Sequence, residues 1–446
     1  MSPTVEYALR AARVLQQQGA EAEAVDLLKR LLSSSPACVP ALQMLGLLCA
    51  THGDMRGAVR LLRQGCVVEP ENGPLRLHLA RVEWEVGMPA QAAASYEQAI
   101  ACHCASADVR VDYAIALQAL KQGAAALAQC DQAIQADPHH ARAWNTKAGL
   151  LHMQDRFGQA LCCHERAIAI APSATAWTDM AATLSALGRL DESVQCHDKA
   201  LDCDPADAIA WTSKGATLAK MGQHRRALGC HLRATGLDPA LAIAWSNTGV
   251  ALACMACGDE ALAAHDKAVS LQPASPVLWL QRGEALMDLG RAAESLASFN
   301  AAIRLEPSSA AAWHCRAVAL CNDGRLWEAL ESLDETICLD ATHAPALLLR
   351  AEVLQLLSRD AETPSSPEQA SLSTTGRIRL RLEKAAIPLT NGDRADGGRS
   401  IQRYRRIGDS AAPGRADLCV WTAAESIEAE RRKLSLRAVD RCRGAA

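Results

Sequence analysis

Large apolar residues recur along this chain with a period of 33 or 34 residues. If each Trp of the series is counted as position 4 of a unit, a small residue stands at position 8 and, in most units, Leu at position 11. Offsets of four and seven place these three positions on one face of a helix. The pattern therefore predicts one amphipathic helix per unit, marked by Trp144, Trp177, Trp211, Trp245, Trp279 and Trp313.

A second helix is predicted within each unit. Gly188, Gly222, Gly290 and Gly324 stand at position 15, and Gly readily adopts the left-handed conformation that ends a helix. Beyond this break, Ala or Ser at position 20, a ring or Leu at position 24 and Ala or Thr at position 27 share another helical face. A Pro at position 32 cannot continue the second helix but suits the start of the next one.

The spacing of small and large residues indicates how the two helices pack. Small residues at positions 8, 20 and 27 would let the helix backbones approach closely, and Trp and Leu would fill the remaining space. We therefore expect the six tryptophans to form the structural core of the repeats. This arrangement of residues resembles the tetratricopeptide repeat.

Weaker copies continue the same frame toward the N-terminus, without Trp at position 4. Gly46, Ala58 and Pro70 fit one such copy, and Ala80 and Tyr96 fit the next. We count ten repeats in residues 5–343, followed by a capping helix at 344–358. The resemblance implies an all-α, right-handed α-solenoid of about ten helix-turn-helix units plus this C-terminal capping helix, with repeats beginning at residues 5, 39, 73, 107, 141, 174, 208, 242, 276 and 310.

The period disappears in residues 359–446. This tail has 17 Lys and Arg against 12 Asp and Glu, whereas residues 1–358 have 29 against 38. Its composition is rich in turn-forming residues, interrupted by the basic segment RIRLRLEK, and Ala423 to Cys442 could form one charged helix. We expect the tail to be mildly basic and mostly disordered.

The family resemblance implies that the first helices line a concave groove that binds a segment of another protein. Positions 2, 5, 6, 9, 12 and 13 lie away from the packing face formed by positions 4, 8 and 11. Polar side chains at positions 5 and 6 could pair with the backbone of an extended peptide, or they could simply be solvated. The candidate groove residues are Asn145, Thr146, Thr178, Asp179, Thr212, Ser213, Ser246, Asn247 and Gln281.

Two more specific chemistries are disfavoured. Co-chaperone members of the family grip a C-terminal carboxylate with Lys, Asn and Arg, but Lys220 and Arg142 lack matching partners in neighbouring repeats. The adjacent pairs Cys163-His164, Cys196-His197 and Cys230-His231 are reminiscent of metal ligands. Adjacent helical residues diverge by about 100 degrees and neighbouring repeats lie about 10 Å apart, which is too far for one zinc ion. We therefore expect no metal and no cofactor.

Other function classes are excluded or kept open on composition. A net charge of -4 argues against nucleic acid, no apolar stretch predicts a membrane span, and the N-terminal residues show no secretory signal. No phosphate-binding loop, nucleophile elbow, HExxH or dinucleotide fingerprint is present. We expect an intracellular, cytoplasmic protein that is not an enzyme and acts as a scaffold or adaptor, with self-association left open. The alternative is the substrate-docking arm of a glycosyltransferase whose catalytic domain is absent here.

Overall fold

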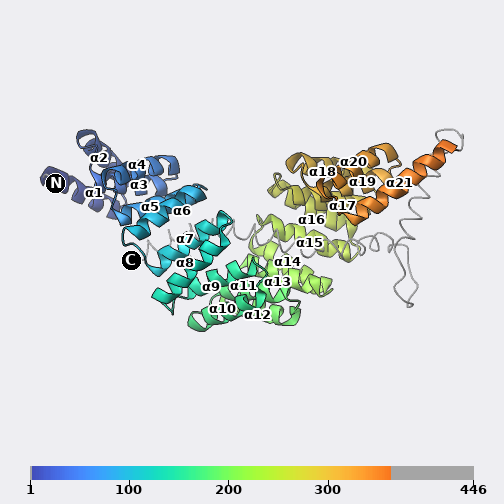
Figure 1. Cartoon of the computed structure of the whole chain (residues 1–446), viewed down its shortest axis with the longest axis horizontal. Coiled ribbons are helices and arrows are strands. Elements are labelled where there is room, and N and C mark those ends of the chain that lie inside the picture. Colours follow the sequence, from blue (N-terminus) through green and yellow to red (C-terminus); the bar gives the residue numbers. More distant parts are fainter. Residues whose placement is uncertain (1–2, 363–446) are drawn as a thin grey trace. The chain divides into compact units, whose positions relative to one another are not determined.

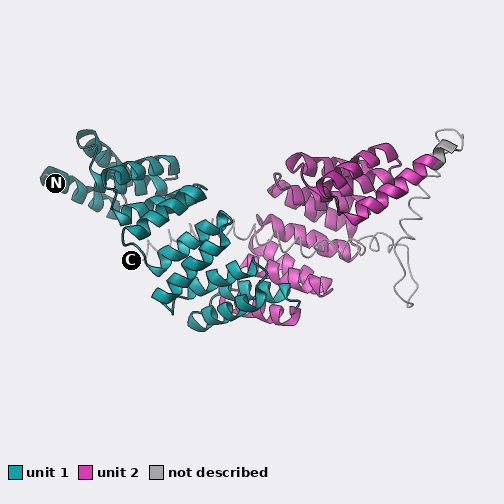
Figure 2. Cartoon of the chain, in the orientation of Figure 1, with its two compact units in different colours: residues 1–188 teal, residues 189–446 magenta. Residues whose placement is uncertain are grey.

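The computed structural model describes residues 3–362, and all the regular structure in this part is α-helical (Figure 1). The chain divides into two compact units, residues 1–188 and residues 189–446 (Figure 2). The helices of the first unit are α1 Pro3–Gln17, α2 Glu21–Ser34, α3 Val39–Thr51, α4 Met55–Val68, α5 Gly73–Glu85, α6 Pro89–Ala101, α7 Ala107–Ala119, α8 Gly123–Ala136, α9 Ala141–His152, α10 Phe157–Ile170 and α11 Ala174–Ala186.

The second unit continues the same pattern of helix lengths. Its helices are α12 Leu190–Cys203, α13 Ala208–Lys220, α14 His224–Leu237, α15 Ala242–Cys254, α16 Gly258–Leu271, α17 Pro276–Asp288, α18 Ala292–Leu305, α19 Ala310–Asn322, α20 Leu326–Leu339 and α21 Ala344–Glu362. The tail expected to be disordered, with its charged helix at 423–442, lies outside the described residues beyond 362.

Within each unit, helices that follow one another in sequence pack against one another. A first helix packs on the second helix of its own pair, and that second helix packs on the next first helix, as α13, α14 and α15 do. Adjacent first helices also touch, for example α7 and α9 or α15 and α17. The predicted all-α class, a solenoid of consecutive helix pairs, is confirmed.

Side-chain caps begin many of the first helices. Ser106, Ser173, Asp207 and Ser309 accept a hydrogen bond from a backbone N–H two or three residues later. The amide groups of a first helical turn have no partner within the helix, so each cap satisfies one that would otherwise need water. Polar residues at the repeat boundary therefore define where these first helices start.

A left-handed residue at position 15 ends each first helix. Seven of these residues are glycines with φ between 74° and 84°, and the predicted role of glycine at position 15 is confirmed. The other three are Lys121, Asp155 and Ala256, with φ of 60°, 57° and 62°. Because a Cβ atom makes this conformation unfavourable, these three turns are held by the packing of the helices that they join.

The core of each pair depends on a close approach between positions 8 and 24. A Cβ atom added at Gly215 would lie 2.4 Å from the ring of His231, and one added at Gly283 would lie 2.5 Å from the ring of Phe299. Both rings are buried. The absence of a side chain at position 8 therefore makes room for the ring at position 24 of the same pair. Leucines at position 11 complete this seam and are almost fully buried: Leu151, Leu184, Leu218, Leu286 and Leu320.

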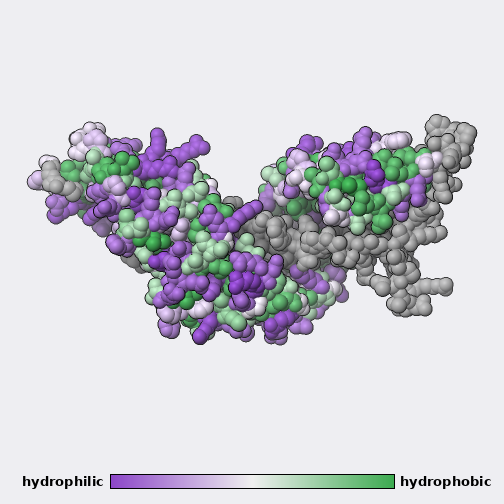
Figure 3. Space-filling model, viewed as in Figure 1, coloured by the Kyte–Doolittle hydropathy of each residue, from purple (hydrophilic) through white to green (hydrophobic). Residues whose placement is uncertain are grey.

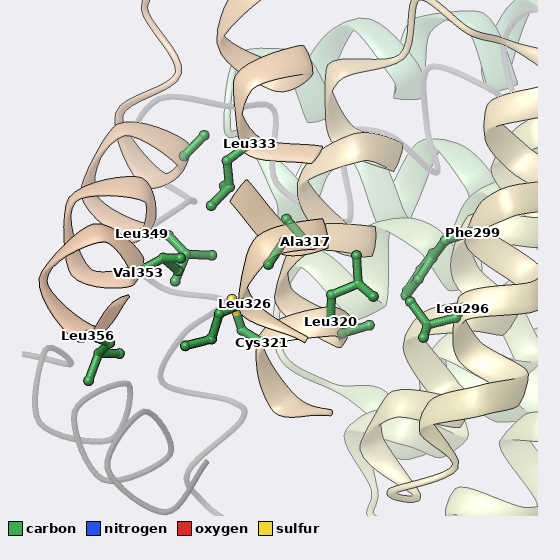
Figure 4. Packing of buried hydrophobic residues seen from close by; sticks show 13 residues of the cluster. Leu296, Phe299, Ala317, Leu320, Cys321, Leu326, Leu333, Leu349, Val353 and Leu356 are labelled. Carbon is green, nitrogen blue, oxygen red and sulfur yellow. The ribbon is translucent and has the colours of Figure 1, made fainter. Parts of the chain in front are cut away.

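The last pair and α21 enclose an apolar cluster in the second unit (Figure 4). Leu320 and Leu333 come from α19 and α20, and Leu349 and Val353 come from α21. All four are 0 or 1 % exposed. The seam between helix pairs therefore continues up to α21.

The six tryptophans lie at the edge of the core, and none is fully buried. Their indole N–H explains this position, since a buried indole needs a hydrogen-bond acceptor. The Nε1 atom donates to the carbonyl of the Pro six residues earlier, at 2.8 to 3.0 Å, in Trp144, Trp211, Trp245, Trp279 and Trp313. The tryptophans thus bind the loop between repeats. The interior, which we predicted to be filled by Trp, is filled by leucines and small residues.

A repeated ion pair links each of several first helices to the preceding second helix. A cation at position 7 contacts an Asp at position 25 of the repeat before it. These pairs are exposed on at least one side, so each stabilises the fold by less than about 1 kcal/mol, but together they mark a common register. They are Lys147 with Asp131, Lys214 with Asp198, Arg282 with Asp266 and Arg350 with Asp334, at 2.5 to 2.6 Å.

One repeat replaces the core Leu at position 11 with a carboxylate. Glu83 is 2 % exposed, and its side chain accepts hydrogen bonds from Arg63, at 2.7 and 3.0 Å, and from Ser95, at 2.7 Å. A buried charge is tolerated only when it is paired and hydrogen-bonded. The hydrogen bonds from Arg63 and Ser95 are therefore needed to stabilise the buried Glu83 carboxylate.

Buried histidines fill position 24 of the middle repeats. Burial lowers the pKa of His164 and His231 to about 4 and that of His197 to about 3. The Nδ1 atoms of His197 and His231 have no hydrogen-bond partner among the described atoms. A second proton on either ring would thus be buried without an acceptor, and the folded protein favours the neutral rings.

We predict that acidification from pH 7 to pH 5 destabilises the protein. The unfolded chain takes up protons on His below about pH 6.5, whereas the folded chain resists them until about pH 4, so stability falls between these values. The loss is roughly 2 kcal/mol for each such His at pH 5. Urea midpoints at the two pH values measure it. The variant His231→Phe, which reproduces the pairing of Gly283 with Phe299, should lose less, and an equal loss in both proteins would contradict the assignment.

Changing Ala256 to Gly should stabilise the protein by about 1 kcal/mol, because it relieves the left-handed strain at position 15. Thermal unfolding measures the gain. The converse change, Gly222→Ala, is the matched control: a Cβ atom there meets nothing within 4 Å, so only the backbone conformation is affected. It should lower the melting temperature, and no change in either variant would show that the turn is not strained.

Changing Gly283 to Ala should destabilise the protein by about 1 to 3 kcal/mol, because its Cβ atom overlaps the Phe299 ring. Adding Phe299→Leu should offset part of this loss, since Ala317 and Leu333 occupy the same two positions in the next pair. Urea denaturation of the two single variants and the double variant gives the coupling between the sites. Additive losses would disprove the close approach.

Candidate functional site

The candidate binding residues lie on what we call the first-helix face, formed by positions 2, 5, 6, 9, 12 and 13 of the first helices. Contacts between adjacent first helices bring these positions together within each unit. The candidates on α9 and α11 belong to the first unit, and those on α13, α15 and α17 belong to the second. The two sets are therefore described separately.

In the first unit, Asn145 joins two first helices. Its Nδ2 atom donates to Oδ2 of Asp179 at 2.8 Å, and its Oδ1 atom lies 2.9 Å from Nδ1 of His164. The hydroxyl of Thr178 donates to Ala174 O at 2.8 Å, and Thr146 is half-buried. Asn145 and Asp179 are thus brought together, while Thr178 is bonded to its own helix.

A polar network extends from Asn145 into the repeat core. The Nε2 atom of His164 lies 3.3 Å from Oγ1 of Thr183, which in turn lies 3.0 Å from Nδ1 of His152. Burial lowers the pKa of His152 and His164, although the Asp179 carboxylate opposes the effect in both. Sequence reasoning missed this network because its members are 19 or 31 residues apart and meet only when the repeats stack.

In the second unit, most of the candidate residues are buried between neighbouring first helices. Thr212, Ser246, Asn247 and Gln281 are 1, 2, 3 and 7 % exposed, and Ser213 is half-buried. Ser246 donates to Gln281, which repeats the link from position 5 to position 6 made by Asn145 and Asp179. Much of the hydrogen-bonding capacity expected for a ligand is therefore used within the protein.

Asn247 breaks this pattern. The preceding position-5 residue is Thr212, whose hydroxyl donates to Ala208 O at 2.8 Å. The Nδ2 atom of Asn247 has no hydrogen-bond partner among the described atoms. An unsatisfied buried amide group costs about 1 to 3 kcal/mol. Asn247 thus carries a buried donor whose hydrogen bond is not made within the described part of the protein.

A charged cluster on α5, α7 and α9 was also missed from the sequence. Asp112 lies 2.7 Å from Arg142 and 3.6 Å from Arg81, and Asp108 contacts Arg142 and His140 at 3.7 and 3.0 Å. Because Arg142 is engaged with two carboxylates, its charge is already balanced. This arrangement agrees with the interpretation that Arg142 is not part of a carboxylate clamp.

The Cys and His pairs considered as metal ligands belong to the packing of the second helices. Cys163, Cys196 and Cys230 are buried, and burial raises the pKa of each thiol. Within residues 3–362, no three side chains of His, Cys, Asp or Glu gather closely enough to hold a metal ion. Cys254 and Cys257 are partly buried free thiols at the end of α15 and in the turn after it.

Among the described helices, none has both the length and the apolar composition needed to cross a membrane.

Solved structures of repeat proteins show only a loose likeness. MamA is 22% identical, over 38% of this chain and 93% of that one, with a TM-score of 0.35. YrrB, described as a TPR protein with an unusual peptide-binding site, is 24% identical over 40% of this chain and 92% of that one, with a TM-score of 0.32. A tetratricopeptide repeat protein from Parabacteroides merdae is 12% identical over 56% of this chain and 98% of that one, with a TM-score of 0.46. These scores are too low to bear on function.

Sequence comparison identifies the repeat directly. No curated protein has a significantly similar sequence. One tetratricopeptide-repeat family model matches residues 77–138 and 280–343, and a second matches residues 198–229. These segments contain helix pairs with the small residues at positions 8, 20 and 27 and the stacking described above. The chain therefore contains tetratricopeptide repeats.

Proposed function

We propose that this protein is a non-catalytic interaction scaffold, or adaptor, which binds an extended segment of another protein along the first-helix face. The repeat family and the row of polar side chains on adjacent first helices support this proposal. An extended main chain presents N–H and C=O groups at regular intervals, and Asn and Gln side chains can both donate to and accept from them.

The observation on which the proposal depends is the unpaired amide group of Asn247. It lies on α15 beside Ser246, which donates to Gln281 on α17, and next to α13, where Thr212 donates to its own helix. If the Asn247 side chain rotates toward the first-helix face, a carbonyl oxygen of a bound segment would satisfy this donor and remove the cost of an unmade hydrogen bond. Such a contact favours binding without needing a charged ligand.

The geometry of the stack suggests how the segment would lie. Adjacent first helices are separated by about 10 Å, and an extended chain advances by about 3.3 Å per residue. Equivalent side chains such as Ser213, Asn247 and Gln281 would therefore meet roughly every third residue of the ligand. This spacing allows the contacts to be made to the main chain and leaves the ligand sequence weakly specified.

We further propose a cytoplasmic setting for this interaction. The 16 cysteines of the described residues are all free thiols, including the exposed Cys162, Cys203 and Cys338. Free thiols on a long helical chain persist in a reducing compartment. The state of these thiols in freshly isolated protein, measured by alkylation and mass spectrometry, tests the setting independently of any ligand.

Changing Asn247 to Ala should weaken binding of an extended peptide by about 5- to 30-fold, because one buried hydrogen bond is lost. The folded protein should retain its stability, since the amide donor has no partner to lose. The full chain is first applied to an array of unstructured peptides, and the affinity of the strongest peptide is then measured by titration.

Lys267→Ala is the matched control, because Lys267 is exposed on the second helix α16, away from the first-helix face. It should leave the affinity unchanged. The proposal fails if the folded full chain binds no peptide above background, or if both variants weaken the strongest peptide equally.

A further inference from the structure

The last helix, α21, stands in the register of a first helix. His343 caps its N-terminus by accepting from Ala346 N at 3.1 Å, as Ser309 caps α19. Arg350 at position 7 pairs with Asp334 at position 25 of the preceding repeat, at 2.5 Å. The residues at positions 3 and 10, Ala346 and Val353, are buried against that repeat. By these criteria α21 begins an eleventh repeat.

The opposite face of α21 is open. In α19, positions 8 and 11 are Ala317 and Leu320, which are 0 and 1 % exposed beneath the second helix of their own pair. In α21 the same positions are Ala351, which is exposed, and Leu354, which is 40 % exposed. Leu347 at position 4 is 44 % exposed. Figure 3 shows hydrophobic residues among polar ones over this part of the second unit.

The positions on α21 that remain exposed are the ones that a second helix covers in other repeats. In the earlier pairs, position 8 contacts the side chain at position 24 of its own second helix, as Gly283 and Phe299 do. An exposed surface of Leu347, Ala351 and Leu354 therefore calls for a helix with a large apolar residue at position 24 and a small one at position 27.

The usual turn does not follow α21. Ser358 stands at position 15, where other repeats have a left-handed residue, and the helix continues to Glu362. A second helix that completes this repeat would therefore have to come from further along the chain. Residues 363–446 follow directly, so any segment among them that fits the open face is held near it at a high effective concentration.

One segment of residues 363–446 has the required spacing. Ile378, Leu382 and Ala385 are separated by four and seven residues, as positions 20, 24 and 27 are, and Pro388 follows where second helices end. Ile at position 20 is larger than the usual Ala or Ser. The segment is basic, with Arg at 377, 379 and 381 and Lys at 384, whereas α20 beside the open face carries four acidic and no basic residues.

We propose that residues 375–387 dock as a helix on Leu347, Ala351 and Leu354 and complete an eleventh helix pair. Leu382 covers Ala351, and Arg377, Arg381 and Lys384, which share one side of such a helix, face the acidic helix α20. Burial of these leucines removes apolar surface from water, and the tether lowers the entropic cost of association. This docking is independent of the binding proposed for the first-helix face.

Hydrogen exchange of the full chain, followed by mass spectrometry, tests the docking with three variants. Leu382→Asp places a charge on the docking face, and Leu354→Asp does the same on α21 at an already exposed position. Both should speed exchange about tenfold in residues 375–387 and in the exposed half of α21, because the contact that slows local opening is lost. Leu380→Asp changes the opposite face of the same segment and should leave exchange as in the unmodified protein.

Two results would overturn the proposal. The first is that the Leu382→Asp and Leu380→Asp variants exchange at the same rate, both in residues 375–387 and in α21. The other is protection of α21 that disappears on about tenfold dilution, because concentration dependence would show that a second copy of the chain covers the face. Protection that is unaffected by dilution and sensitive to Leu382 and Leu354 supports docking within one molecule.

Discussion

The structure depends on the close approach of two helices at one point in each pair, where a small residue at position 8 meets the side chain at position 24. At Gly215 and Gly283 even a Cβ atom would overlap the facing ring. This contact sets the distance between the helices, and the leucines at position 11 then fill the seam beside it. Interiors are packed too densely to absorb a misplaced group, so the same constraint recurs in pair after pair.

The seam also explains why polar residues could enter the core without disrupting it. His164, His197 and His231 are as large as the aromatic residues that share their position, and they pack against small residues in the same way. Their cost is that they must remain neutral. Glu83 is the opposite solution, because it keeps its charge and accepts hydrogen bonds from Arg63 and Ser95. The shape of the packed side chains is the same from repeat to repeat, whereas each buried polar group is stabilised in its own way.

The first-helix face consists of positions on the first helices that do not pack in the seam. Positions 5 and 6 of adjacent first helices are close enough to bond to one another, as Asn145 does with Asp179 and Ser246 with Gln281. Polar side chains in a row on such a face therefore form hydrogen bonds with one another first, and only those left over can bind a ligand. Asn247 differs because Thr212, the residue before it in the row, directs its hydroxyl to its own helix. The capacity to bind another chain depends on such interruptions.

The spacing of Trp, small residues, Leu and Gly was sufficient to determine that the chain forms paired helices, because helical periodicity and left-handed turns are local properties of the sequence. The location of the tryptophans at the edge of the core required the tertiary structure, since leucines and small residues from neighbouring helices fill the interior instead. The same holds for the His164 network, the Asp112 cluster and the open face of α21. These features depend on contacts between residues far apart in the sequence, and the stacking of the helices decides which of those residues meet.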